Sequence, residues 1–279
     1  MCIRDSYDMH DMVDPYVYFY LRELRKISHT LVFVSTAKLD RKDLDKLAHI
    51  GCEVILRENI GYDFMSYKLG LKSLEHAAFD EIVVCNDSVY GPFFDLASIF
   101  SRMTSQSCDF WGMTSNTDIS YHLQSYFVVF KKNALNSNAF RAFWEAVTNL
   151  DTKEEIIRRY EVGMTRCLLK SGLKAATSAE YNPTFSERLI YLSKRFSVDK
   201  IHNKIRALVS GENVIPKINA THSFWKELIL QGKMPFLKVE PLRDNPMKID
   251  INDYENVIKS VSDYDVRLIK NHLSRVADQ

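Results

Sequence analysis

The sequence predicts an α/β fold in which helices flank a mostly parallel β-sheet. Continuous apolar runs at residues 31–35 and 82–85 are typical of short strands that are buried on both faces. Helical patterns lie between these runs, and this alternation favours parallel strands joined by right-handed crossovers. A chain of 279 residues has enough material for the core of one large domain or two small ones.

The start of the chain departs from this pattern. A first strand is expected before Tyr7, but residues 1–6 are too short and too charged to form one. We therefore expect the first strand to be missing from the sheet, because the N-terminus is truncated or carries a foreign leader. The elements that follow are regular: a helix at 16–27, a strand at 31–35, a helix at 41–50 and a strand at 53–56.

The stretch from Arg57 to Pro92 combines a turn, a helix, a strand and a polar loop. Asn59 and Gly61 suit a tight or left-handed backbone, and Asp63 is the predicted N-cap of the helix. Three polar residues follow the strand at 82–85, namely Asn86, Asp87 and Ser88. Open α/β sheets bind ligands outside the carboxyl ends of their strands, so this loop is placed for chemistry, although N-D-S is also ordinary turn sequence.

The rest of the chain adds two strands, several helices and a loop-rich segment. Helices are predicted at 95–103 and 139–147, and a helical run from Thr152 to Leu169 is interrupted at 161–165. Strands are predicted at 108–112 and 126–130. The segments beyond them are a helical stretch at 181–208, loops at 216–246 and two helical segments at 253–276. We divide the chain into a main domain, 1–246, and a C-terminal helical extension, 247–279.

The composition excludes several classes of protein. The chain has 37 basic and 36 acidic residues and a net charge of +1, so no nucleic acid is expected as a partner. Five cysteines without C-x-x-C spacing argue against a disulfide framework or a structural zinc site. We expect a cytoplasmic protein, because no apolar run approaches the roughly 20 residues that cross a bilayer. Basic residues at 194–206 form a solvated helix face in the simpler interpretation, and attraction to anionic lipid at the inner face of the cell membrane is the weaker alternative.

Several segments in succession carry a resemblance to a known family: E-N-I-G-Y-D-F, N-D-S-V-Y-G-P-F, D-F-W-G-M-T, H-L-Q-S-Y-F-V-V-F and Y-E-V-G-M-T. With the later H-S-F-W-K-E-L and P-F-L-K-V-E-P-L-R-D-N-P, they closely resemble rhamnan synthesis protein F from about Tyr7 to Pro246. This family is associated with rhamnose-containing polysaccharides of the bacterial cell wall or lipopolysaccharide. Several segments are also similar to family 2 glycosyltransferases of the GT-A fold.

The resemblance implies a GT-A-like fold and an inverting glycosyltransferase, in particular a rhamnosyltransferase. The donor would be a nucleotide sugar, dTDP-rhamnose, and the acceptor a lipid-linked or polymeric glycan of the cell surface, of the rhamnan or O-antigen type. Such a reaction must neutralise a departing diphosphate and deprotonate an acceptor hydroxyl. Carboxylate-bound Mg²⁺ or Mn²⁺ usually meets the first demand, with the phosphates completing the metal shell.

The resemblance also implies roles for particular residues. Glu161 matches the general base, and Asp109 is the next candidate. The nucleotide-sugar side would consist of Asn59, Gly61, Asp63, Asn86, Asp87 and Ser88. The pocket for the donor sugar and the acceptor would be lined by Trp111, Thr114, His122, Gln124 and Ser125. A metal would be bound by Asp87 and His222.

Simpler interpretations compete with these roles. Asp87 is flanked by uncharged residues where related enzymes have an acidic D-x-D motif, which weakens the metal site and leaves lysine and hydroxyl donors as an alternative. Asp63 is more simply a helix cap, Glu161 by itself a surface residue, and His122 and His222 structural histidines. Two other functions compete: a non-catalytic carbohydrate-binding module of a polysaccharide assembly system, and a nucleotidyltransferase, whose Gly-rich basic phosphate loop is not visible here.

Overall fold

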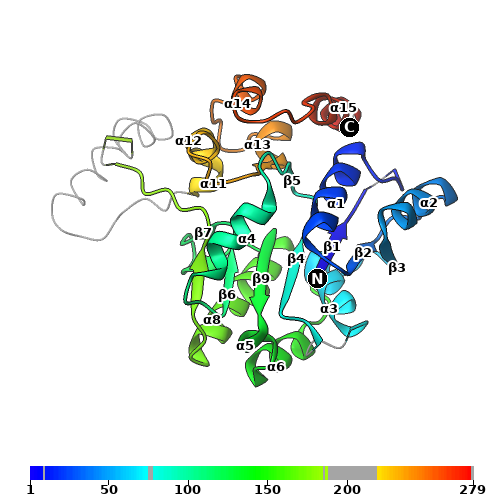
Figure 1. The fold of residues 1–279 in the computed structure, drawn as a ribbon, viewed down its shortest axis with the longest axis vertical. Coiled ribbons are helices and arrows are strands. Elements are labelled where there is room, and N and C mark those ends of the chain that lie inside the picture. The colour runs from blue at the N-terminus through cyan, green and yellow to red at the C-terminus, as the bar shows by residue number, and fades with distance from the viewer. Residues whose placement is uncertain (9, 75–77, 185, 188–218, 278–279) are drawn as a thin grey trace.

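The structure is a computed structural model that describes residues 1–8, 10–74, 78–184, 186–187 and 219–277. Within these residues the centre is a seven-stranded sheet in the order β10-β6-β9-β4-β1-β2-β3 (Figure 1). Strand β9 runs antiparallel to β4 and β6, and the other neighbours pair in parallel. The predicted α/β fold with a mostly parallel sheet is therefore confirmed. The strands are β1 (Cys2–Ser6), β2 (Leu31–Ser35), β3 (Cys52–Leu56), β4 (Glu81–Cys85), β6 (Phe110–Gly112), β9 (Phe127–Lys131) and β10 (Ala175–Thr177).

Two short ribbons lie outside this sheet. Strand β5 (Val89–Tyr90) pairs antiparallel with β11 (Leu237–Lys238), and β7 (Ser115–Asn116) pairs antiparallel with β8 (His122–Leu123). The first ribbon joins the loop after β4 to a segment almost 150 residues later in the chain. Both ribbons follow strands of the central sheet, so they extend the edge at which β4 and β6 end.

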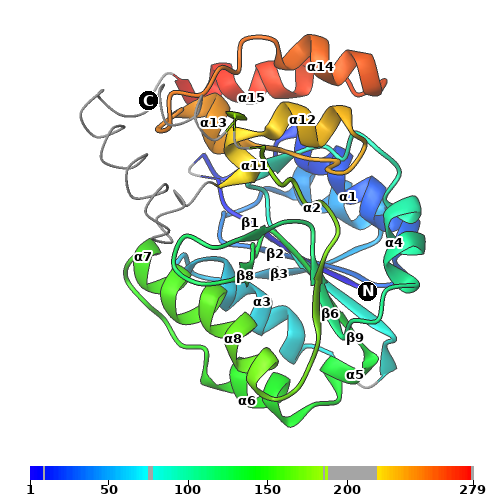
Figure 2. The ribbon, with the colours of Figure 1, turned by 90° about the vertical axis from the view of Figure 1, so that its left-hand side faces the viewer.

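Helices cover both faces of the sheet (Figure 2). Because strand side chains alternate between faces, Cys2 packs into one apolar cluster and Ile3 into the other. One face carries α1 (Pro15–Ile27), α2 (Arg41–Ile50), α4 (Leu96–Thr104), α11 (Ala220–Ser223), α12 (Trp225–Leu230), α13 (Val239–Arg243), α14 (Tyr254–Val261) and α15 (Arg267–Ala277). The other carries α3 (Tyr62–Lys72), α5 (Lys132–Leu135), α6 (Asn138–Ala146), α7 (Lys153–Ile156), a π-helical turn (Ile157–Glu161) and α8 (Val162–Lys170).

The prediction that residues 1–6 form no paired strand is wrong. Strand β1 lies in the middle of the sheet and pairs in parallel with β2 on one side and β4 on the other. The charged residues suggested otherwise, but Arg4 is buried with its guanidinium 4.7 Å from the centre of the Tyr20 ring. Asp5 lies near the carboxyl end of the strand, where Asp63 and Asp87 are its electrostatic neighbours. Charge alone is therefore no bar to a central strand when the charged groups reach an aromatic face or a sheet edge.

The other predicted elements from residue 16 to 147 form close to their expected positions, with helix α2 and strand β2 at the predicted bounds. Residues 247–279 contain helices α14 and α15, whose apolar side chains join the same cluster as those of α1. The basic residues at 194–206 lie outside the described residues. Among the helices that the structure does describe, none has the length and apolar character needed to cross a membrane.

Helix α3 packs so closely on β1 that the contact gives a test of the strand. A Cβ added to Gly70 would lie 2.4 Å from Cγ2 of Ile3, a β-branched side chain that is fully buried. We expect Gly70→Ala to lower the free energy of unfolding by about 1–3 kcal/mol, because overpacking forces side chains or backbone to move. The measurement is denaturant unfolding followed by circular dichroism.

The matched control is Gly163→Ala in α8, where the nearest atom to the added Cβ would be 3.8 Å away. This change should leave stability unaltered or raise it by roughly 0.5–1 kcal/mol, because alanine favours a helix over glycine. Equal stability of the two variants would contradict the close packing of α3 on β1.

Candidate active site

A tightly held turn precedes helix α3 at the carboxyl edge of the sheet. Gly61 and Tyr62 both have positive φ angles, +82° and +54°, and such an angle is uncommon for a residue as large as tyrosine. The Arg57 guanidinium donates hydrogen bonds to three backbone carbonyls of the turn, those of Glu58, Ile60 and Tyr62, at 2.8, 2.6 and 2.5 Å. Arg57 therefore stabilises the unusual backbone that places Asp63 at the sheet edge. Asn59 lies exposed in the same turn.

Four polar side chains form a continuous chain of hydrogen bonds across this edge. Asp63 Oδ2 accepts a hydrogen bond from Asn86 Nδ2 at 3.0 Å. Asn86 Oδ1 accepts from the backbone N–H of Ser88 at 3.1 Å and from its hydroxyl at 2.6 Å. Lys238 Nζ donates to the Ser88 hydroxyl at 3.2 Å. The structure thus brings together three residues predicted for the nucleotide-sugar side and adds Lys238, which the sequence analysis misses.

The prediction that Asp63 is the N-cap of α3 is wrong. The cap position belongs to Gly61, because glycine adopts the left-handed backbone there without a clash. Asp63 lies in the first turn of the helix, where its Oδ1 accepts a hydrogen bond from the backbone N–H of Phe64 at 3.0 Å. Burial and the neighbouring Glu161 carboxylate raise the pKa of Asp63 to about 6. Its second oxygen is left to face Asn86 and the sheet edge.

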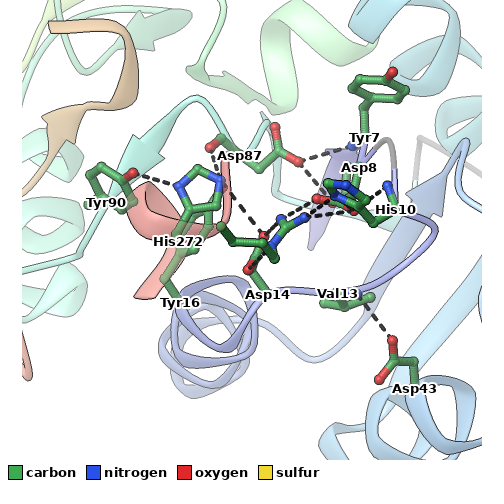
Figure 3. A network of polar contacts seen from close by, with 12 residues as sticks. Tyr7, Asp8, His10, Val13, Asp14, Tyr16, Asp43, Asp87, Tyr90 and His272 are labelled. Atoms are coloured by element: carbon green, nitrogen blue, oxygen red, sulfur yellow. Dashed lines mark hydrogen bonds and ion pairs between the residues drawn. The ribbon is translucent and has the colours of Figure 1, made fainter. Parts of the chain in front are cut away.

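Asp87 is fixed by the end of β1 and by helix α1 (Figure 3). Its Oδ2 accepts hydrogen bonds from the Ser6 hydroxyl at 2.8 Å and the Tyr7 backbone N–H at 3.0 Å. Its backbone carbonyl accepts from the Tyr16 hydroxyl at 3.0 Å. Burial raises the pKa of Asp87, and burial together with the Asp87 and Asp63 carboxylates raises the pKa of Asp5. Asp5, Asp63 and Asp87 are therefore three carboxyl groups at one edge of the sheet, and each is harder to ionise than a free carboxyl group.

Glu161 lies at the end of a π-helical turn, and its carboxylate contacts the side chains of Ser125 and His122. Its Oε2 accepts a hydrogen bond from the Ser125 hydroxyl at 2.9 Å, and its Oε1 lies 3.4 Å from His122 Nε2. The Ser120 carbonyl is 2.7 Å from His122 Nδ1 and so fixes the ring. Burial lowers the pKa of His122, but the Glu161 carboxylate and the Ser120 carbonyl outweigh burial and raise it. Such single π turns occur frequently at functional sites, and the sequence pattern shows only that the helix is interrupted here.

Lys238 is a cation near the carboxylates of Asp63 and Glu161. Its Nζ lies 3.9 Å from the centre of the Tyr126 ring, and β11 places it there by pairing with β5. Burial lowers the pKa of Lys238 to about 8, although the nearby Glu161, Glu240 and Asp63 carboxylates act to raise it. The residue is found only through the long-range pairing of two-residue strands, for which the sequence carries no local signal.

Two predicted site residues do not reach this edge. Asp109 precedes β6 and therefore lies at the opposite, amino edge, where it accepts hydrogen bonds from Asn133 Nδ2 and the Lys174 backbone N–H, both at 2.7 Å. Trp111 is fully buried and packs against the Phe100 ring at 5.2 Å, so it belongs to the core and does not face a sugar.

Thr114 and Gln124 lie near the site, but their side chains form a hydrogen bond with each other. The Thr114 hydroxyl donates to Gln124 Oε1 at 2.6 Å and lies 2.8 Å from the Tyr126 hydroxyl. Gln124 Oε1 also accepts from the Thr221 hydroxyl. All three of these contacts are buried. Thr114 therefore helps to hold Tyr126, whose ring lies against the Lys238 ammonium group.

The two residues predicted to share a metal have separate partners. Nδ1 of His222 lies 3.8 Å from Oε2 of Glu240, whereas Asp87 contacts the end of β1. Burial and the nearby Lys238 cation lower the pKa of His222 to about 4. Within the described ranges, no three His, Cys, Asp or Glu side chains gather in an arrangement that could hold a metal. A shared Asp87–His222 metal site stays a prediction.

Comparison with known proteins assigns the chain to a family. A family model described as rhamnan synthesis protein F matches residues 31–209, which is more than half of the sequence. The chain belongs to the rhamnan synthesis protein F family. The match contains the turn at Arg57, the loop after β4 and Glu161, but not Lys238 or helix α15.

Curated relatives and solved structures extend the comparison. Virulence protein VirA of Vibrio anguillarum is 28% identical over 257 residues, covering 88% of this chain and 78% of that protein. The uncharacterized protein y4gN of Sinorhizobium fredii is 30% identical over 142 residues, covering 49% of this chain and 37% of that protein. The glycosyltransferase GlyE of Streptococcus pneumoniae is 10% identical with a TM-score of 0.44 over 99% of this chain and 64% of its own. The chain thus spans less than two thirds of GlyE, and no conclusion on activity rests on a likeness of this size.

Proposed function

We propose that this chain is an inverting glycosyltransferase that moves a sugar from a nucleotide donor to a bacterial cell-surface glycan. Rhamnose is the proposed sugar, dTDP-rhamnose the donor, and a lipid-linked or polymeric glycan the acceptor, in keeping with the family. The observation that carries the proposal is the carboxylate of Glu161, held by Ser125 and His122 and within electrostatic range of Asp63 and Lys238. A carboxylate base near a lysine cation suits transfer from a nucleotide sugar better than glycan binding alone.

Glu161 is the proposed general base for the acceptor hydroxyl. A base of this kind is oriented by a further group, and here the Ser125 hydroxyl and the His122 ring hold the two carboxylate oxygens. Both oxygens of the Glu161 carboxylate are thereby held in place to accept the proton of the acceptor hydroxyl. The proton of the acceptor hydroxyl would pass to Glu161 as the sugar carbon is attacked from the face opposite the leaving diphosphate.

Lys238 and the Ser88 hydroxyl are the proposed ligands of the departing diphosphate. A cation in a partly buried position stabilises a charged leaving group more strongly than an exposed one, because the surrounding dielectric is lower. Asn59 and Gly61 would line the nucleotide at the neighbouring turn, as the resemblance implies. The reaction would take place in the cytoplasm, at the inner face of the membrane when the acceptor is lipid-linked.

A divalent metal fits this site only in part. Mg²⁺ is often held by one or two carboxylates, with substrate phosphates completing its shell, and Asp87 with Asp5 offers such a pair. The crowding of these carboxyl groups supports the fit, because a bound cation would relieve their mutual repulsion. Mg²⁺ or Mn²⁺ would supply extra positive charge for the diphosphate. Lys238 already provides a cation at the same edge, so we propose that the metal assists the reaction and is not indispensable.

The proposal is tested by a thermal-shift screen of nucleotide sugars with and without Mn²⁺. A ligand that binds only the folded state raises the melting temperature by mass action. We expect dTDP-rhamnose and dTDP to raise the melting temperature. In a separate assay, we expect radiolabelled rhamnose to be transferred to a glycan acceptor. Glycan binding without any response to nucleotides or nucleotide sugars would refute the transferase and favour a carbohydrate-binding module.

The first functional prediction concerns the base. Glu161→Gln keeps the size of the side chain but removes the basic oxygen, so kcat should fall by roughly 10²–10⁴ while donor affinity stays nearly unchanged. Steady-state kinetics with varied donor measure both quantities. The matched control is Asp109→Asn at the amino edge of the sheet, which should leave kcat within about twofold. Near-normal turnover of Glu161→Gln would end the assignment of the base.

A second prediction follows from the pKa of Lys238, which is lowered to about 8. The ammonium group is charged below this pH and neutral above it, so donor affinity should weaken as the pH rises through about 8. Lys238→Arg keeps its charge throughout this range and should lack the alkaline loss, whereas Lys238→Met should bind dTDP weakly at every pH. Calorimetric titration with dTDP between pH 6.5 and 9.5 measures the effect. Identical pH profiles for the wild type and Lys238→Arg would show that Lys238 does not bind the diphosphate.

A third prediction concerns metal. Because Lys238 supplies one cation and Asp87 lacks flanking acids, EDTA should reduce transfer only partly, by roughly tenfold or less. The assay is a chelator titration of the transfer rate, followed by addition of Mn²⁺. Complete loss of activity at low chelator with full recovery in Mn²⁺ would show that the metal is indispensable.

A further inference from the structure

The C-terminal helix α15 reaches back to the segment that follows β1. The guanidinium of Arg275 contacts the carboxylates of Asp8 and Asp14 and also lies 2.6 Å from His10 Nδ1. Both carboxylates are shielded from solvent, with side-chain exposures of 10% for Asp8 and 7% for Asp14. One cation therefore neutralises two shielded anions that are separated from it by more than 260 residues of chain.

A second residue of α15 contacts the same region. His272 Nδ1 lies 2.6 Å from the Tyr90 hydroxyl, and its ring centre is 4.8 Å from that of Tyr16 (Figure 3). Its Nε2 lies 3.8 Å from Oδ2 of Asp14. Tyr16 and Tyr90 belong to different elements, α1 and β5, so the histidine links the start of α1 to the ribbon after β4.

The segment held by α15 is the one that holds Asp87. Figure 3 shows the backbone at Tyr7 directed at the Asp87 carboxylate, with Asp8 next to it in the chain. Tyr16 lies just after Asp14 at the start of α1, and its hydroxyl donates a hydrogen bond to the Asp87 carbonyl. Asp87 is thus contacted from both ends of the segment 7–16, and Arg275 joins two points within that segment.

We infer that Arg275 of helix α15 is a positioning residue for Asp87, and that the C-terminal helix completes the nucleotide-sugar side of the site. Removing the guanidinium leaves two shielded carboxylates without their shared cation. Such unpaired shielded charges are costly, and they would push Asp8 and Asp14, with the backbone beside them, toward water. The backbone N–H of Tyr7 would then withdraw from Asp87. Where the inference speaks of donor binding, it rests on the proposed function.

The experiment compares Arg275→Ala with Arg267→Ala. Arg267 lies on the same helix, but it is exposed and binds only Asp265 through its side chain among the described residues. The first readout is hydrogen exchange of the Tyr7 amide and of residues 8–14, which requires no ligand. The second is calorimetric titration with dTDP. Helix content and melting temperature are recorded for each variant so that gross unfolding is recognised.

We expect Arg275→Ala to speed exchange at Tyr7 and to weaken dTDP binding by roughly 2- to 30-fold, while Arg267→Ala changes neither. Adding Asp14→Asn to Arg275→Ala removes one of the stranded charges and should restore much of both losses. If Arg275 acted only through the packing of its side chain and not through its charge, the added Asp14→Asn would restore neither slow exchange nor dTDP affinity. If Arg275→Ala itself unfolds the chain, the same comparison is made with Arg275→Lys, which keeps the charge and should retain slow exchange.

The inference is overturned if exchange at Tyr7 in Arg275→Ala matches that of Arg267→Ala. Where Arg275→Ala unfolds the chain, it is overturned if Arg275→Lys, which keeps the charge, exchanges at Tyr7 faster than Arg267→Ala. It is also overturned if exchange rises but dTDP affinity stays unchanged. A wild type that binds no dTDP would refute the proposed donor. In that case the exchange data alone would decide whether Arg275 positions Asp87.

Discussion

The crowding of carboxyl groups at the carboxyl edge of the sheet is the constraint on which the rest of this site depends. Asp5, Asp63 and Asp87 come from three different segments, and burial raises the pKa of each. Neighbouring carboxylates add to the rise for two of them: Asp87 and Asp63 act on Asp5, and Glu161 acts on Asp63. Such a cluster persists only if hydrogen bonds and nearby cations share the charge. The turn at Arg57 and the ribbon that carries Lys238 are therefore parts of the same electrostatic arrangement, although they are far apart in the sequence.

Most of the fold could be predicted from the sequence because its signals are local. Buried strands such as β2 and β4 are continuous apolar runs, and α1 and α2 have clear amphipathic spacing. Strand β1 could not be recognised in this way, since its polar residues obscure an apolar pattern of only two side chains. Its pairing is dictated by the neighbours on both sides, and a single segment read alone does not contain that information.

The candidate site was predictable where its residues follow one strand and not where it depends on tertiary pairing. Asn86 and Ser88 were found because they come directly after a buried strand, the position where α/β sheets bind ligands. The same rule excludes Asp109, which comes before its strand. Lys238 lies in a segment that carries the family resemblance, but that segment marks no role for the lysine, and Arg275 lies in no such segment. Each also reaches a partner across more than 100 residues of chain. The resemblance supplied Glu161, and the π-helical turn explains how that residue leaves the solvated face of its helix.

The π-helical turn also limits how this segment can vary in length. The backbone N–H of Val162 bonds to the carbonyl of Ile157, five residues earlier, so the turn contains one residue more than an α-helix would. Each residue of an α-helix turns the chain by about 100°. Deleting one residue here would rotate α7 by that angle relative to α8, and either the buried Ile156 or Glu161 would lose its place. Substitutions of exposed residues between α7 and α8 are therefore tolerated. Insertions and deletions are not, because Ile156 must stay buried while Glu161 keeps its place at the site.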